Sequence, residues 1–158
     1  MPSERSHIEQ NTRERERLRA LVERLRDEEL RAPVNESWTV AGVLGHIGFW
    51  DARALVLANK LVRGVPFSPS DAEPEDVDWI NDAARPLIHA IAPREAAQLA
   101  LRLADETDQR IASLPPGLIA RTWPEDPDSP LNPLRAAHRA EHLDEIEAAL
   151  RARGRGPG

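Results

Sequence analysis

The sequence contains no cysteine. This absence excludes disulfide bonds, zinc–thiolate sites, iron–sulfur clusters and a cysteine nucleophile. Any chemistry that needs a thiol would therefore have to take that thiol from a substrate.

Long apolar segments are also missing. No run approaches the ~20 apolar residues that a membrane-spanning helix needs. The first seven residues, Met1–His7, have no apolar core of the kind found in a signal peptide. We therefore expect a soluble, cytoplasmic protein that has no membrane partner.

The balance of charge is acidic. The 21 Lys and Arg residues are outnumbered by 27 Asp and Glu residues, which gives a formal net charge of −6. An acidic chain is poorly suited to bind nucleic acid or an anionic membrane, so we expect neither partner. With 158 residues the chain can bury a hydrophobic core, and we interpret residues 1–158 as a single domain.

The hydrophobic pattern predicts helices and no strands. Four long segments are either apolar at helical spacing or apolar nearly all round, and they span residues 6–31, 40–62, 93–114 and 134–150. Thr39 or Ser37 is a suitable N-cap for the second of them, and Gly64 marks its end. A shorter helix over residues 79–85 should break at Pro86. The sequence therefore predicts an all-α protein, a four-helix bundle with long connections.

Two of the connections are unusually long. Residues 65–78 are acidic and contain several prolines. A loop of this length in a compact domain is often a lid or the wall of a pocket, with disorder as the alternative. Residues 118–133 form a second Pro-rich connection that leads into the last helix.

The last helix carries two histidines, His138 and His142. They are four residues apart, so both rings project from the same face of the helix. Leu134, Ile146 and Ala149 lie on or beside this face, which indicates that the histidines point into the interior. Buried imidazoles need partners, either hydrogen-bonding groups in the core or a shared metal ion, and the pair alone does not choose between them.

A third histidine, His46, lies in the apolar second helix. Metal sites in helix bundles are built from side chains on facing helices, so His46 is the natural third ligand beside His138 and His142. The pattern is not that of a zincin protease. In that class a glutamate that acts as general base follows the first histidine, and here the residue is Arg139.

Two glycines lie close to His46 on the same predicted helix. Gly42 and Gly45 would let another backbone or a ligand approach closely, at some cost in helix stability. The two remaining histidines have less informative surroundings. His7 lies near the N-terminus and His89 lies in an apolar stretch beside Pro-rich sequence, so we expect structural roles for both.

Two blocks of sequence resemble a known family. In the first, residues 36–51 (ESWTVAGVLGHIGFWD), Trp-Thr opens a helix, a histidine is followed by an apolar residue, and an aromatic–acidic pair comes next. The second is His138-x-x-x-His142 on the last helix, followed by Leu143 and Ile146. In this order and on these helices, the blocks resemble the DinB-like superfamily of four-helix metalloproteins. That superfamily includes mycothiol- and bacillithiol-dependent S-transferases.

The resemblance implies a four-helix bundle of the up-down-down-up type that forms a homodimer. It also implies metal ligands at the positions of His46, His138 and His142, and a further residue near the pocket at Asn81. A low-molecular-weight thiol similar to mycothiol would be the cosubstrate.

Three neutral imidazoles suit zinc, nickel or iron(II), and the sequence does not choose among these metals. Three protein ligands leave at least one coordination position open, as in catalytic sites. Glu145, three residues after His142, is either a carboxylate that orients an imidazole or a surface residue. Asp51 has the same two interpretations. With Asn81, these two carboxylates are the candidate catalytic residues.

Arginines could serve an anionic substrate. Arg53 and Arg135 lie near the histidines in the helical pattern and could contact a negatively charged group. Pairing with acidic residues at the surface is the commoner role of arginines on helices.

Three functions remain open at this point. In the first, a small-molecule thiol loses its proton at the metal and attacks an electrophile. In the second, metal-activated water hydrolyses an ester or an amide, but no general acid or base can be assigned, which favours thiol transfer. In the third, the bundle binds a metal or ligand without catalysis. A lid-covered cavity over the histidines would favour an enzyme, and tightly packed apolar walls would favour a structural role.

Overall fold

The computed structural model describes residues 6–154, and every regular element in this range is helical. The elements in chain order are α1 (Ser6–Arg24), α2 (Asp27–Leu30), α3 (Val40–Arg63), the 3-10 turn η1 (Pro69–Asp71), α4 (Asp78–His89), α5 (Pro93–Ala112), α6 (Pro116–Ile119) and α7 (Ala136–Gly154). The predicted all-α class is confirmed for the described residues.

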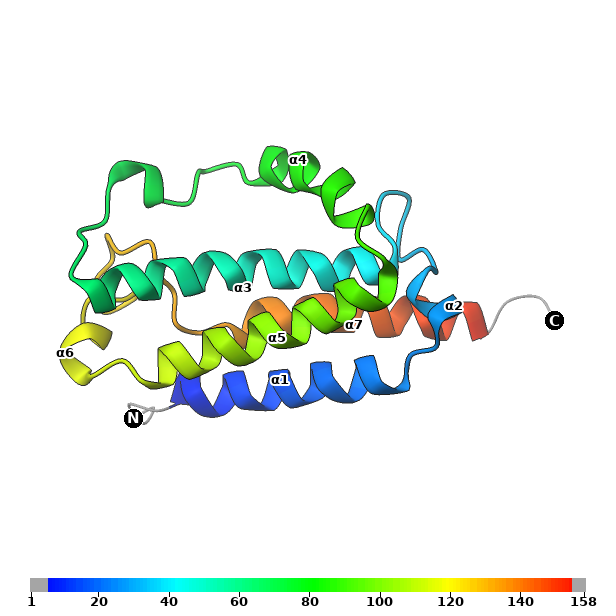
Figure 1. The fold of residues 1–158 in the computed structure, drawn as a ribbon, viewed down its shortest axis with the longest axis horizontal. Helices are drawn as coiled ribbons and strands as arrows, with labels where there is room; N and C mark the ends of the chain where they lie inside the picture. The colour runs from blue at the N-terminus through cyan, green and yellow to red at the C-terminus, as the bar shows by residue number, and fades with distance from the viewer. Residues whose placement is uncertain (1–5, 155–158) are drawn as a thin grey trace.

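The four long helices lie side by side along the length of the molecule (Figure 1). Helices α1 and α7 run in one direction, and α3 and α5 run in the opposite direction. Helix α1 packs against α5 and α7, and α3 packs against the same two helices. The short helix α4 covers one side of α3 (Figure 1).

The interior is filled by the apolar faces of these helices. The stripe predicted on the first helix, which includes Leu18, Leu21 and Val22, is buried. Helix α5 contributes mainly alanines, and a Cβ atom added to Gly48 of α3 would lie only 3.4 Å from the Cα atom of Ala100. Small residues on both helices therefore allow α3 and α5 to approach closely.

By length and composition α3 is able to cross a membrane, contrary to our expectation that no segment comes near this requirement. However, 72% of its apolar 18-residue window is buried inside the protein. A helix that is apolar nearly all round is also what the centre of a globular core requires. The packing of α3 against α4, α5 and α7 accounts for its composition.

The ends of α3 agree with the sequence. The hydroxyl oxygen of Thr39 accepts a hydrogen bond from the backbone N–H of Gly42 at 2.9 Å, so Thr39 is the N-cap. At the other end Gly64 has a φ of 70°, the left-handed conformation in which glycine commonly ends a helix.

The first helix ends earlier than predicted. A single helix over residues 6–31 is wrong, because the chain turns at Arg26, whose ψ of 160° is extended. The guanidinium of Arg94, on α5, donates hydrogen bonds to the carbonyl oxygens of Val22 and Leu25 at 3.1 and 2.6 Å. These carbonyls at the helix end are satisfied by a residue about 70 positions away, and no local pattern reveals that contact.

The predicted break at Pro86 is also wrong, since α4 continues through it to His89. Proline removes one backbone hydrogen bond, but contacts with α3 hold the last turn in place. A Cβ atom added to Gly45 would lie 2.6 Å from the Cγ2 atom of Ile88, and one added to Gly42 would lie 2.3 Å from the Nε2 atom of His89. The space left by the two glycines is thus filled by α4.

The first long connection is ordered and lies against the C-terminal half of α3. Asp71 pairs with Lys60 at 2.6 Å, and its backbone oxygen accepts a hydrogen bond from Arg53 at 2.7 Å. Lys60 is 14 residues beyond His46, which corresponds to about 21 Å along a helix. The turn at residues 69–71 therefore lies beside the part of α3 that follows His46.

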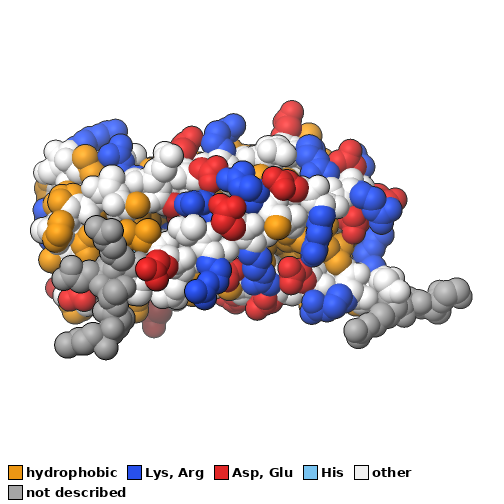
Figure 2. Space-filling view, turned by 90° about the horizontal axis from the view of Figure 1, so that it is seen from below, with side chains coloured by type: hydrophobic (Ala, Val, Ile, Leu, Met, Phe, Trp, Pro, Cys, Tyr) orange, Lys and Arg blue, Asp and Glu red, His pale blue; other side chains and the backbone are white. Residues whose placement is uncertain are grey.

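The outer face of α1 carries charges of both signs, as expected for a solvated helix face. In Figure 2, which views the molecule from the α1 side, acidic and basic side chains alternate over this surface. Arg17 pairs with Asp144 and Glu147 of α7, and Arg19 pairs with Asp105 of α5.

A side chain of α1 fixes the start of α7. The carboxamide oxygen of the buried Asn11 accepts hydrogen bonds from the backbone N–H groups of Arg135 and Ala136 at 2.7 and 2.9 Å. Its amide group donates to the carbonyl oxygen of Pro133 at 2.8 Å. Asn11 therefore caps a helix that begins 125 residues later in the chain, two residues beyond the predicted start at Leu134.

Replacement of Asn11 by alanine would leave three buried or half-buried backbone groups without partners. We expect Asn11→Ala to lower the free energy of unfolding by about 2 kcal/mol, as lost caps and unsatisfied polar groups do. Urea denaturation followed by circular dichroism measures this change. The control is Gln109→Ala at an exposed position of α5, which should alter stability by less than about 0.5 kcal/mol. Equal stability of the Asn11→Ala and wild-type proteins would contradict the capping role.

Candidate metal centre

Three histidines meet where α3 and α7 pack together. His46 comes from the first half of α3, and His138 and His142 are one turn apart on α7. The Nε2 atoms of His46 and His142 are 3.1 Å apart, and the ring centroids of His138 and His142 are 4.6 Å apart. One ring nitrogen from each histidine lies within 4.8 Å of the others. The structure thus brings together all three residues that the sequence nominated as ligands.

Burial keeps two of the three rings uncharged. Desolvation, reinforced by the neighbouring His142, lowers the pKa of His46 to about 4 and that of His138 to about 2. Both rings are therefore neutral at pH 7, and each has a nitrogen lone pair available for a metal ion. The Nδ1 atom of His138 is buried without a hydrogen-bond partner in the protein. Buried polar atoms rarely lack partners, so this donor set fits a bound divalent ion.

Glu145 contacts the cluster from outside. Its Oε2 atom lies 3.2 Å from the Nδ1 atom of His142, one turn away on α7. With this contact on Nδ1, the other ring nitrogen of His142 faces His46. The carboxylate is therefore placed to fix the tautomer and the orientation of the imidazole, one of the two roles that the sequence left open for it.

An aromatic residue borders the cluster on the α4 side. The Trp38 ring packs edge-on against His46, with centroids 5.5 Å apart, and against His89 at 5.3 Å. His89 is exposed and lies beyond Trp38, outside the group of three. His7, on α1, is also outside the group, and burial lowers its pKa.

Asn81 is linked to the helix of His46 through Trp50. Its carboxamide oxygen accepts a hydrogen bond from the indole Nε1–H group of Trp50 at 2.9 Å, which links α4 to α3. Trp50 follows His46 by one helical turn. Asn81 therefore holds Trp50, a neighbour of the cluster, and its hydrogen bond is to this indole and not to an imidazole.

Asp51 takes part in a buried ion network and does not contact the histidines. Its two carboxylate oxygens accept hydrogen bonds from Arg135 at 3.1 Å and from Arg139 at 3.0 Å. Arg139 has no exposed surface, and its other nitrogens donate to both oxygens of Asp108 at 2.9 and 2.8 Å. Arg15 also pairs with Asp108, at 3.0 Å.

Sequence reasoning missed this network, although a signal was present. Ala136, Arg139, Leu143 and Ile146 are the buried residues of α7 and follow one another at helical spacing. An arginine in phase with a buried apolar stripe requires a buried acidic partner. The sequence interpretation used Arg139 only to exclude a zincin motif.

The two arginines considered for an anionic substrate are occupied by the protein itself. Arg135 pairs with Asp51 and donates to the backbone oxygen of Trp50. Arg53 donates to the backbone oxygen of Asp71, and burial lowers its pKa. Each guanidinium therefore already has partners within the protein.

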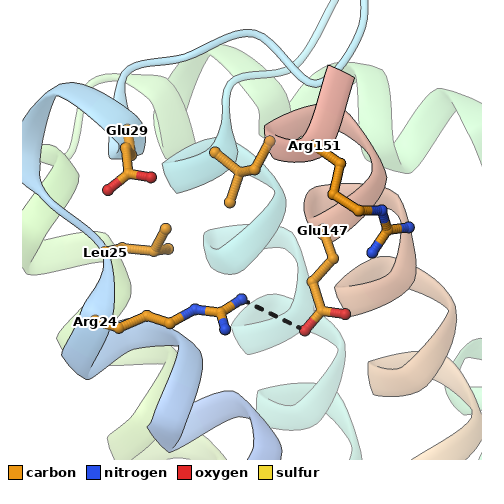
Figure 3. Close-up of a pocket in the computed structure, with 6 residues that line it drawn as sticks. Arg24, Leu25, Glu29, Glu147 and Arg151 are labelled. Atoms are coloured by element: carbon orange, nitrogen blue, oxygen red, sulfur yellow. Dashed lines mark ion pairs between the residues drawn. The ribbon is translucent and has the colours of Figure 1, made fainter. Parts of the chain in front are cut away.

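Two hollows in the surface lie away from the histidines. Figure 3 shows one of about 480 Å³ between the end of α1, helix α2 and the end of α7, where Arg24 and Glu147 pair at 3.8 Å. A second, of about 410 Å³, lies between α3 and α5. The cluster reaches the surface instead through His142, whose side chain is 17% exposed beside Glu145 at 42%. Neither of the two hollows is lined by a histidine of the cluster.

A family model described as the DinB superfamily matches residues 10–146 of this chain. The chain belongs to the DinB superfamily. The match includes α3, both long connections and the two histidines of α7, so it covers the whole candidate site. Neither a curated protein nor a solved structure matches this DinB-superfamily chain.

Metal content tests the role of the three histidines most simply. We expect tag-free protein to carry about one zinc, nickel or iron ion per chain, because three imidazoles from two helices meet at one point. His142→Ala should lower metal affinity by more than about 100-fold, since removing a ligand costs at least as much as removing a group that orients one. His89→Ala is the matched control, because His89 touches the same Trp38 ring but lies outside the group of three. Metal-free wild-type protein that takes up none of these ions would make the histidines core residues.

Glu145 offers a second test on the same helix. Glu145→Gln removes the carboxylate that contacts His142 and should weaken metal binding by about 10-fold to 100-fold, the usual effect of an orienting partner. Glu141→Gln removes an equal charge from an exposed position one residue before His142 and should leave affinity unchanged. Competition with a chromophoric chelator measures both constants, and equal affinities of the two variants would assign Glu145 to the surface.

Proposed function

We propose that this protein is a metal-dependent enzyme that transfers a low-molecular-weight thiol, similar to mycothiol, to an electrophile. We further propose that it works in the cytoplasm as a homodimer, with its four long helices arranged as an up-down-down-up four-helix bundle. The observation that carries the proposal is the cluster of His46, His138 and His142, which consists of three imidazoles and no carboxylate. Membership of the DinB superfamily supports it.

The chemistry needs a group that makes a thiol nucleophilic near neutral pH, because the chain has no cysteine of its own. A divalent ion held by the three histidines would supply this by lowering the pKa of a substrate thiol. The protein contributes three imidazoles, and burial keeps those of His46 and His138 neutral. Glu145 fixes the orientation of His142, and His142 lies on the side of the cluster open to solvent.

The carboxylates near the cluster argue for thiol transfer over hydrolysis. A hydrolase needs a general acid or base beside the attacking water. Asp51 is buried and paired with two arginines, so it cannot serve as a base for a substrate. Glu145 contacts the Nδ1 atom of His142, on the side of the ring away from His46. Thiol transfer requires neither group, because the thiol proton can pass to solvent.

The test follows an S-transfer reaction whose atoms balance. A thiol and monochlorobimane give a fluorescent thioether and chloride: a carbon–sulfur bond forms, the carbon–chlorine bond breaks and the thiol proton goes to water. Protein loaded with zinc, nickel or iron(II) is assayed with mycothiol, bacillithiol, glutathione and cysteine in turn. We expect turnover with at least one thiol that falls by more than about 100-fold in His142→Ala, which loses a ligand, and is kept in His89→Ala.

The other outcomes point to the alternatives. Hydrolysis of p-nitrophenyl acetate without thiol turnover, lost in His142→Ala, would identify a metal-dependent hydrolase. Metal binding with neither activity would leave a non-catalytic metal- or ligand-binding bundle and would overturn the proposed transferase.

A further inference from the structure

The helices that carry the three histidines are joined by a buried acid–base contact close to the cluster. Asp51 lies five residues after His46 on α3, and Arg139 directly follows His138 on α7. The Oδ2 atom of Asp51 accepts a hydrogen bond from Nε of Arg139 at 3.0 Å, and neither side chain is exposed. Arg135, one turn earlier on α7, donates to the Oδ1 atom of Asp51 at 3.1 Å. One carboxylate of α3 is thus held by two successive turns of α7.

The guanidinium of Arg139 also pairs with a second buried carboxylate, that of Asp108. Arg139 donates to both carboxylate oxygens of Asp108 on α5, and Arg15 of α1 pairs with Asp108 in turn. Asp51 and Asp108 are both buried, and each pairs with Arg139 and one further arginine. The two aspartates differ in the helix that carries them. Asp51 is on α3, which carries His46, whereas Asp108 is on α5, which carries no histidine.

We propose that Asp51, through Arg139 and Arg135, is a positioning residue that sets the alignment of α3 against α7 and thereby the arrangement of the three ring nitrogens. This proposal rests on the metal site of the proposed function. Sliding of α7 along α3 by a fraction of a turn would separate His46 from His138 and His142. Apolar side chains tolerate such a shift, whereas two directional hydrogen bonds to one carboxylate do not.

Stability alone does not explain why Asp51, Arg135 and Arg139 are charged residues in the interior. Buried ion pairs contribute little net stability, because removing both charges from water costs about as much as their attraction returns. Their best-attested use is to fix one arrangement among several. The contact between Asp51 and α7 lies within two helical turns of all three histidines, where a fixed arrangement has a consequence for metal binding.

The experiment compares two isosteric substitutions on the same guanidinium. Asp51→Asn and Asp108→Asn each remove one buried charge next to Arg139, and only the first weakens the link between the two helices that carry histidines. Cobalt(II) is the probe, titrated into metal-free protein. The readouts are the dissociation constant, the visible ligand-field spectrum, which reports coordination geometry, and the melting temperature of the metal-free protein.

We expect Asp51→Asn to weaken cobalt binding by about 10-fold to 100-fold, as loss of an outer positioning contact does, and to shift the ligand-field bands. Asp108→Asn should weaken binding by less than about 3-fold and keep the wild-type spectrum, since α5 supplies no ligand. Both variants should lower the melting temperature. A change in spectrum confined to Asp51→Asn is the result that a purely structural role would not produce.

A second pair covers the case in which Asp51→Asn does not fold. Arg135→Met removes one of the two α7 contacts to Asp51 and leaves Arg139 in place. Its counterpart, Arg15→Met, removes the outer arginine of Asp108. We expect the same difference within this pair: cobalt binding is weakened and the spectrum is altered in Arg135→Met, and neither changes in Arg15→Met.

Two results would overturn the inference, and they are distinguishable. If the wild-type protein binds cobalt and both members of each pair change affinity and spectrum equally, the positioning role is wrong and the proposed function stands. If the wild-type protein binds no cobalt, zinc, nickel or iron, the proposed function falls and the inference falls with it.

Discussion

A single buried guanidinium joins all four long helices. Arg139 projects from α7 and donates to Asp51 of α3, to Asp108 of α5 and to the backbone oxygen of Asn11 of α1. The side chain has no exposed surface, so its charge depends entirely on these partners. The pKa of Arg139 is raised, because the two carboxylates outweigh the effect of burial. The mutual placement of the helices follows from satisfying this one cation, and the histidine cluster lies directly beside it.

The network also shapes the electrostatics of the cluster. Arg135 and Arg139 contribute to lowering the pKa of His138, after burial and the neighbouring histidines. The same positive charges would repel a divalent ion, and the carboxylates of Asp51 and Asp108 offset them. The neutral rings of His46 and His138 and the compensated arginines together make the site suited to a metal ion.

The sequence predicted the site better than its surroundings. His46, His138 and His142 were found because helical spacing alone puts the last two on one face and bundles build sites across facing helices. The cap at Thr39 and the stop at Gly64 were found because their causes are local. The end of α1 was missed because Arg94 satisfies it from α5, and the course of α4 through Pro86 was missed because glycines of α3 receive its last turn. These misses share one cause, since each depends on a partner far away in the chain.

The central claim is that three imidazoles from α3 and α7 hold one divalent ion. Crystals of protein loaded with zinc, nickel or cobalt, measured just above the absorption edge of the metal, test it most directly. The account predicts one strong anomalous peak per chain, bonded to ring nitrogens of His46, His138 and His142, with Glu145 on the outer nitrogen of His142. A peak bound elsewhere, or no peak and a direct hydrogen bond between His46 and His142, would contradict the account and leave the histidines as a feature of the core.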